Sequence, residues 1–274
     1  MLELQENIRE VKSQYDKNKN NCNKIEQIDY MRSLIKLYHN FECKKTYEEM
    51  MREYKVRYIY NESKVEGNIT PEEQLGIGVV YDYIQKFDFE KDYFNVFTTS
   101  LLIHQKLYSK CFYKEFGGKL RTESVYLKNS NIEIMEPLAA QKYFNSFISK
   151  SEEVFIPLDE NDILGYIEKC IKLTTDLIKV QPFQDGNKRT FRSLLNLLLK
   201  KATLPPIYIN INHRVEYKKY LMDAILNDEY SGIYEFYYNR IEEAIFELDL
   251  YNREIEEEVK TYRLLRDIKN ISKY

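Results

Sequence analysis

The feature that most constrains this chain is a short polar loop containing glycine, set between two strongly apolar helical segments. The loop lies in the run from Gln181 to Arg192, QPFQDGNKRTFR. Before it, apolar residues recur every three to four positions, and after it five leucines fall within residues 194–199. This pattern predicts a helix with one apolar face, followed by a helix that is apolar nearly all round and therefore buried.

The residues of the loop favour an anionic ligand. Backbone N–H groups and the positive end of the following helix attract anionic oxygens. Asp185 offers a hard oxygen ligand to Mg²⁺, which usually takes only one or two carboxylates. Lys188, Arg189 and Arg192 can neutralise phosphate charge. The run therefore predicts a site for a polyphosphate and its metal. The alternative is a plain turn, in which Gly186 only tolerates a positive φ.

Most of the remaining chain is predicted to be helical, which gives an all-α fold with one small β-hairpin. Helical periodicity runs through residues 2–60 with a polar interruption at 18–23, so two or three amphipathic helices are expected there. The run Thr70-Pro71-Glu72-Glu73 has a capping hydroxyl, a proline and first-turn carboxylates, and it predicts the start of another helix.

Three further helices and the hairpin follow from the same patterns. One helix is expected over about 97–107, one from a cap at Asp159 up to the loop, and one over 248–271. Arg121 to Leu127 is the one convincing extended segment and predicts the hairpin.

Bulk composition excludes several functional classes. A net charge of −3 over 274 residues, with scattered basic residues, argues against a nucleic-acid partner. The chain has no run of the roughly 20 apolar residues that span a membrane. The four cysteines form no C-x-x-C pair, so structural zinc is not expected and a reducing cytoplasm is the expected location.

The run from Gln181 to Arg192 resembles the signature of the Fic (Fido) family, His-x-Phe-x-(Asp/Glu)-Gly-Asn-(Gly/Lys)-Arg-x-x-Arg. It departs from that signature at one defined position, because Gln181 stands where the family carries its catalytic histidine. The resemblance implies the helical Fic fold, ATP as a substrate, Mg²⁺, and transfer of AMP to a hydroxyl group of a protein.

The resemblance also implies roles for the residues of the run. The catalytic positions are Gln181, Asp185, Asn187 and Arg189, with Asp185 as the metal ligand. The nucleotide-binding positions are Phe183, Gly186, Asn187, Lys188, Arg189 and Arg192.

Residues 63–68, SKVEGN, resemble the inhibitory motif of the family, (Ser/Thr)-x-x-x-Glu-(Gly/Asn). The match is imperfect, because Glu62 stands four residues before Glu66 and the nearest hydroxyl, Ser63, stands three before it. The resemblance implies that Ser63, Glu66 and Gly67 form the motif and that Glu66 pairs with Arg192, which obstructs the γ-phosphate. A solvated surface glutamate is the alternative.

Residues 117–121, GGKLR, together with Val125, Tyr126 and Leu127, resemble the flap of the family, a hairpin that binds a target segment by strand addition. A plain surface hairpin is the alternative. His104 occupies a helical position that relatives also fill with histidine, which implies a structural role.

The resemblance covers about residues 60–250. It divides the chain into an N-terminal helical extension over 1–60, a Fic domain over 61–247 that includes the inhibitory motif, and a C-terminal helix over 248–274.

A glutamine at position 181 removes the general base, because an amide has no usable basicity, whereas the pKa of an imidazole lies near operating pH. Loss of a general base typically reduces the rate by about 10²–10⁴. Three explanations stay open: an introduced inactivating change, a natural nucleotide-binding pseudoenzyme, or a natural enzyme with another base, of which Glu66 is the nearest candidate.

Three function classes follow. The first is a transferase of AMP that is restrained by Glu66 and impaired by Gln181. The second is transfer of the γ-phosphoryl group, because Lys188 also occurs at this position in the Doc toxins; Arg192 argues against it. The third is a non-catalytic nucleotide-binding interaction module. The expected partners are a nucleoside triphosphate and a protein target at the flap, and a homodimer is left open.

Overall fold

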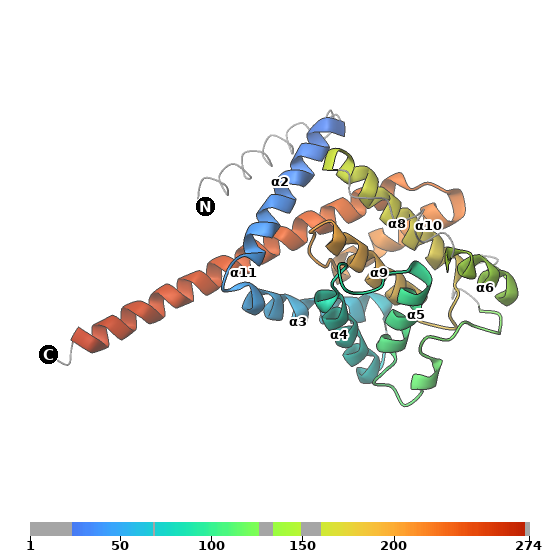
Figure 1. Ribbon diagram of the computed structural model, residues 1–274, viewed down its shortest axis with the longest axis horizontal. Coiled ribbons are helices and arrows are strands. Elements are labelled where there is room, and N and C mark those ends of the chain that lie inside the picture. Colours follow the sequence, from blue (N-terminus) through green and yellow to red (C-terminus); the bar gives the residue numbers. More distant parts are fainter. Residues whose placement is uncertain (1–23, 68, 126–133, 149–159, 272–274) are drawn as a thin grey trace.

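The computed structural model describes residues 24–67, 69–125, 134–148 and 160–271, and within them every regular element is a helix and none is a strand (Figure 1). This confirms the all-α fold class. The helices are α2 (Lys24–Glu42), α3 (Tyr47–Glu66), α4 (Pro71–Lys86), α5 (Val96–Leu107), α6 (Pro137–Asn145), α8 (Ile163–Val180), α9 (Asn187–Lys201), α10 (Arg214–Asn227) and α11 (Ser231–Ile271). Short 3₁₀ turns lie at η1 (Lys114–Phe116), η2 (Glu160–Asp162) and η3 (Ile211–His213).

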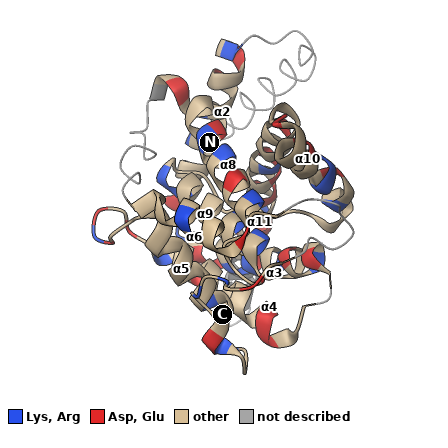
Figure 2. Cartoon of the chain, turned by 90° about the vertical axis from the view of Figure 1, so that its right-hand side faces the viewer, with Lys and Arg blue, Asp and Glu red and all other residues tan. Residues whose placement is uncertain are grey.

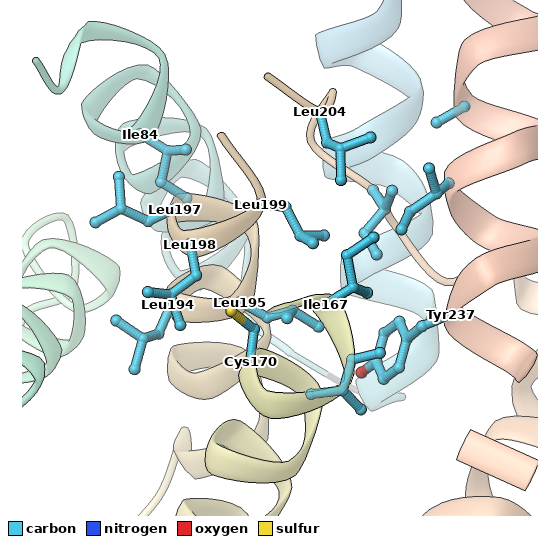
Figure 3. Packing of buried hydrophobic residues seen from close by; sticks show 14 of the residues in the cluster. Ile84, Ile167, Cys170, Leu194, Leu195, Leu197, Leu198, Leu199, Leu204 and Tyr237 are labelled. Carbon is cyan, nitrogen blue, oxygen red and sulfur yellow. The ribbon is translucent and has the colours of Figure 1, made fainter. Parts of the chain in front are cut away.

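Helix α9 lies at the centre of the core. All five of its leucines within residues 194–199 are buried, as the apolar pattern predicted. Figure 3 shows them between Ile84 of α4, Ile167 and Cys170 of α8, and Tyr237 of α11. The first turn of α9 is buried as well, at Asn187, Arg189 and Thr190, and it forms one end of the polar loop.

The helix starts follow local capping chemistry. Thr70 and Glu73 form a capping box at the start of α4, with Pro71 in the first turn, which confirms the predicted helix start. The cap of α8 is Asp162, whose side chain accepts a hydrogen bond from the N–H of Gly165. The predicted cap, Asp159, lies outside the described residues, and the helix itself begins at Ile163 because Asp162 satisfies the first free N–H groups.

Helix α11 is 41 residues long and extends well away from the helical body at its C-terminal end (Figure 1). It starts at Ser231, not at residue 248, because no proline or glycine interrupts the chain after Gly232. Helix α3 likewise runs unbroken across residues 60 and 61. Neither predicted domain boundary therefore coincides with the end of a helix, and α2, α3 and α11 share one hydrophobic core with the other helices.

The segment predicted as the flap hairpin is only partly described. Residues 121–125 are irregular, and Tyr126 and Leu127 lie outside the described residues. The hairpin therefore stays a prediction. Of the described helices, none is both long enough and apolar enough to cross a membrane. Lysine, arginine, aspartate and glutamate are interspersed along the helices on the face shown in Figure 2.

Truncating a leucine of α9 should destabilise the whole domain. Leu197 has no exposed surface, so Leu197→Ala should lower the free energy of unfolding by about 2–5 kcal/mol in a urea titration. Leu75 of α4 is a matched control with 61% exposure, and Leu75→Ala should change the free energy by no more than about 0.5 kcal/mol. Equal losses in the two variants would contradict the central position of α9.

Candidate functional site

The polar loop joins α8 to α9 through two residues with left-handed backbone. Gln181, the residue after α8, has φ 50° and ψ 60°, and Gly186, the residue before α9, has φ 74°. Glycine is needed at 186 for a second reason, because a Cβ there would lie 2.8 Å from the hydroxyl oxygen of Tyr108. The loop therefore depends on glycine both for its backbone conformation and for its close contact with α5 and the residue that follows it.

Asn187 stabilises the loop through hydrogen bonds of its side chain. Its Oδ1 accepts a hydrogen bond from the N–H of Phe183 (2.9 Å), and its Nδ2 donates to the Phe183 carbonyl (2.8 Å) and to Oε1 of Gln181 (2.9 Å). The residue is buried. Since both amide hydrogens already have acceptors inside the loop, Asn187 holds the shape of the site.

Both the nitrogen and the oxygen of the Gln181 side-chain amide form hydrogen bonds in this network. Nε2 donates to the carbonyl of Ile178 (2.6 Å), while Oε1 accepts from Asn187. Arg121 holds the backbone here, because its Nε donates to the Gln181 carbonyl (2.6 Å) and its N–H donates to the Pro182 carbonyl (2.9 Å). The glutamine thus keeps a structural role at the position where the family signature has histidine.

Phe183 anchors the loop in the core. Its ring is fully buried and stacks on the imidazole of His104 with the centroids 3.9 Å apart. The predicted contact between Phe183 and a nucleotide is therefore corrected, because no part of the ring is accessible to a ligand.

His104 is the partner of this ring and has a structural role, as predicted. Its Nδ1 accepts from the N–H of Gly118 (2.8 Å), so Nε2 carries the proton and donates to the Asp185 carbonyl (3.0 Å). Burial lowers the pKa of His104 to about 4, which keeps the ring neutral at physiological pH. The imidazole links the loop to the glycine pair after η1.

Asp185 and Arg189 form the outer, ligand-facing part of the loop. Oδ2 of Asp185 accepts from the Tyr108 hydroxyl (2.9 Å) and from Nη2 of Arg189 (3.0 Å). Nη1 of Arg189 donates to Oε1 of Glu73 at the start of α4 (2.8 Å). The Asp185 side chain is 74% exposed, whereas that of Arg189 is buried. Among the described residues, Nε of Arg189 is buried without a hydrogen-bond partner.

A metal ion at this site would depend on the exposed carboxylate of Asp185. Within the described part of the chain, no three His, Cys, Asp or Glu side chains are grouped as a metal site. Mg²⁺ fits such a position, because it commonly takes one or two carboxylates from the protein and completes its shell with phosphate oxygens and water. Asp185 is therefore the residue that would hold the ion.

Arg192 lies one turn further along α9 and is paired with two carboxylates of α3. Its Nη1 donates to Oε1 of Glu66 (2.7 Å), and its Nε and Nη2 both donate to Oε2 of Glu62 (2.8 and 2.7 Å). Oε2 of Glu66 also lies 3.1 Å from Nζ of Lys188. The structure thus pairs Glu66 with Arg192, as the inhibitory motif implied, and adds Lys188 as a second partner of Glu66. Gly67 ends α3 directly after Glu66 with φ 100°.

Ser63 does not belong to this cluster. Its Oγ donates to the carbonyl of Tyr60 within α3 (2.7 Å), and Glu62 occupies the place beside Arg192. The predicted role of Ser63 is therefore corrected. Glu62 and Glu66 stand four apart on one face of α3 and reach the same guanidinium, whereas the Ser63 hydroxyl is bonded within the helix.

Charge pairing dominates the electrostatics of the cluster. Burial alone would raise the pKa of Glu66, but Arg192 and Lys188 outweigh it and lower the pKa to about 2. Burial likewise opposes the charge of Arg192, yet Glu62 and Glu66 raise its pKa well above the usual value. A carboxylate with so low a pKa is a weak base, which counts against Glu66 as a substitute for the missing histidine.

A cavity of about 610 Å³ opens beside the loop. Asp185 and Gln184 form one side, residues 119–123 form another, and the rings of Tyr108 and Tyr113 contribute an aromatic wall. The cavity therefore joins the exposed carboxylate of the loop to the segment that leads into the predicted flap.

Sequence reasoning missed the roles of four residues of the site. Glu73 is recognisable as a first-turn carboxylate, but its pairing with Arg189 crosses 116 positions of sequence. Tyr108, Arg121 and Glu62 likewise find their partners through long-range contacts. Only Glu62 had a local hint, because it stands where the inhibitory motif has a hydroxyl.

Residues 97–199 match the Fic/DOC family. The match covers 103 of the 274 residues of the chain. Two relatives named protein adenylyltransferase Fic are similar to this chain. The one from Nematostella vectensis is 27% identical over 156 residues, and the one from Aedes aegypti is 30% identical over 159 residues. Each match covers 56% of this chain but only 34% and 29% of the respective relative, so the chain spans about a third of their length.

Two solved structures share the fold. Fic-1 from C. elegans (residues 134–508) superposes with a TM-score of 0.63 at 21% identity, over 79% of this chain and 69% of that one. A Fic-domain-containing signaling protein from Bacteroides thetaiotaomicron has a TM-score of 0.63 at 17% identity, over 80% and 94%. At these identities the likeness concerns the fold, and it confirms the helical Fic architecture around the loop.

Acid should weaken the pairing of Glu66. Because its pKa is lowered in the folded state, the pair stabilises the fold above the ordinary carboxyl pKa of 4.5, and this contribution is lost as the pH falls toward about 2. Glu66→Gln removes the titration, so its free energy of unfolding should fall less steeply over this window than that of the unmodified protein in urea titrations. Glu49→Gln, at an exposed position of the same helix, should match the unmodified slope. Parallel slopes for all three proteins would contradict the pairing.

Proposed function

We propose that this protein is a Fic-type scaffold for moving AMP from ATP to a hydroxyl group of a protein, restrained by Glu66 and impaired by Gln181. The observation that carries the proposal is the ion pair between Glu66 and Arg192, which joins residues 126 positions apart beside the Fic loop. The relatives named adenylyltransferases support the reaction class at the level of the family.

In this proposal the triphosphate lies at the N-terminus of α9. Arg189 and Arg192 supply guanidinium charge, and the loop N–H groups face the same end of the helix. Arg192 is not free for a phosphate while Glu66 accepts from its Nη1. Mg²⁺ held by Asp185 would offset the charge of the phosphate oxygens. The target would approach through the cavity between Asp185 and residues 119–123.

Gln181 determines how far the chemistry proceeds. Its Nε2 donates to the Ile178 carbonyl, and an imidazole at this position could donate its Nδ1–H to the same carbonyl. That contact would leave Nε2 unprotonated and able to take a proton from a target hydroxyl. The amide has no such site, so positioning and charge stabilisation are the catalytic terms that the present residues supply.

Non-catalytic nucleotide binding is the second candidate. The observation that favours it is the complete engagement of the Gln181 amide within the loop, which makes glutamine a stabilising residue here. Transfer of the γ-phosphoryl group is the third outcome of the same experiment, and Lys188 would then act on the phosphate once Glu66 releases it.

Restoring the base should restore transfer. We expect Gln181→His to raise the incorporation of label from α-labelled ATP into protein by about 10²-fold or more, the usual contribution of a general base. Gln181→Asn, an amide without basicity, is the matched control and should show no gain. Incorporation from γ-labelled ATP alone would support phosphoryl transfer, and retained ATP binding without any incorporation would support the binding module.

Removing the carboxylate of the loop should abolish the effect of Mg²⁺ on binding. We expect Asp185→Ala to lower the ATP affinity measured with Mg²⁺ by titration calorimetry to the value measured with EDTA, because Asp185 is the exposed carboxylate of the loop that would hold the ion. Gln184→Ala, at the exposed neighbouring position, should keep the Mg²⁺ effect. A full Mg²⁺ effect in the Asp185 variant would place the ion elsewhere.

A further inference from the structure

Glu62 is a second carboxylate on Arg192, one helical turn before Glu66 on the same face of α3. We infer that Glu62 is a positioning residue that orients the Arg192 guanidinium and limits the positive charge it offers to a phosphate, also after Glu66 has been displaced. This inference rests on the proposed function, in which Arg192 contacts the phosphates of a nucleotide.

The two carboxylates take different edges of the guanidinium. Oε2 of Glu62 accepts from Nε and Nη2, whereas Oε1 of Glu66 accepts from Nη1. A phosphate that replaced Glu66 would therefore meet the Nη1 side of a group that Glu62 still holds. The direction of the arginine is set before any ligand arrives, which lowers the entropic cost of forming the new contact.

Glu62 is the carboxylate that stays in place. Its second oxygen, Oε1, accepts from the backbone N–H of Ile209 (3.1 Å), so its departure would leave that buried donor without an acceptor. Its side chain is 5% exposed, and that of Arg192 is 4% exposed. Glu66 is 11% exposed, and the side chains of Arg192 and Lys188 hold it. A competing anion can therefore replace Glu66 without disturbing the backbone.

The charges of the cluster follow from this arrangement. Glu62 and Glu66 together balance Arg192 and Lys188. When an anion displaces Glu66, Glu62 continues to offset Arg192, so the net positive charge of the remaining three side chains of the cluster is that of Lys188. Removal of Glu66 alone should thus expose a well-directed guanidinium whose attraction for phosphate remains reduced.

The test compares Mg-ATP and AMP binding in a background without Glu66. In Glu66→Gly, adding Glu62→Gln removes the charge but keeps an amide oxygen near Arg192, and we expect Mg-ATP to bind roughly ten-fold more tightly. AMP, which lacks the β- and γ-phosphates, should bind equally to both proteins. Titration calorimetry measures both ligands, and thermal melting of each variant reports its folding.

A second variant provides the test if the variant with Glu62→Gln does not fold. Glu62→Ser places a hydroxyl at the position where the inhibitory motif has one, and it should also tighten Mg-ATP binding in the Glu66→Gly background. A folded double variant with unchanged or weaker Mg-ATP affinity, or with an equal gain for AMP, would overturn the inference. If Glu66→Gly itself binds no Mg-ATP, the proposed function fails instead.

Discussion

Two buried arginines at the start of α9 each require a carboxylate, and this requirement determines which helices surround the loop. A guanidinium removed from water costs free energy unless it is paired. Arg189 meets Glu73 at the start of α4, and Arg192 meets Glu62 and Glu66 at the end of α3. The same ion pairs that shape the candidate phosphate site therefore attach α3 and α4 to the central helix.

In the proposed function, the loop would bind an anion and act on it through two different sets of side chains. Asn187 and Gln181 hold each other and the backbone of the turn, and neither contact needs a basic side chain. The charged groups, Asp185 and Arg189, belong to another network that includes Tyr108. Under the proposed function, a change of the residue at 181 would alter the reaction while the charged groups near the phosphates stay in place, because the two networks use different atoms.

Features encoded by neighbouring residues were predictable. The capping box at Thr70 and the buried leucines of α9 follow from local hydrogen bonds and from periodicity. The start of α8 was less predictable, because Asp162 and not Asp159 provides the cap, and either aspartate satisfies the local pattern. The start of α11 at Ser231 was missed. The helix is uninterrupted, so the residues inside it do not indicate where it begins to pack against the other helices.

The sequence by itself determined the loop, its charged residues and the helices on either side, because each depends on residues close together in the chain. Tertiary structure decided which side chains meet. On α3, one residue corresponds to a rotation of about 100°, so the docking of the helix alone selects Glu62 over Ser63 as the neighbour of Arg192. Phe183 became a core anchor for the same reason, since the stacking surface it covers belongs to a helix 79 positions earlier, at His104. Local sequence specifies what a residue can bind, and only the packing of distant helices specifies what it does bind.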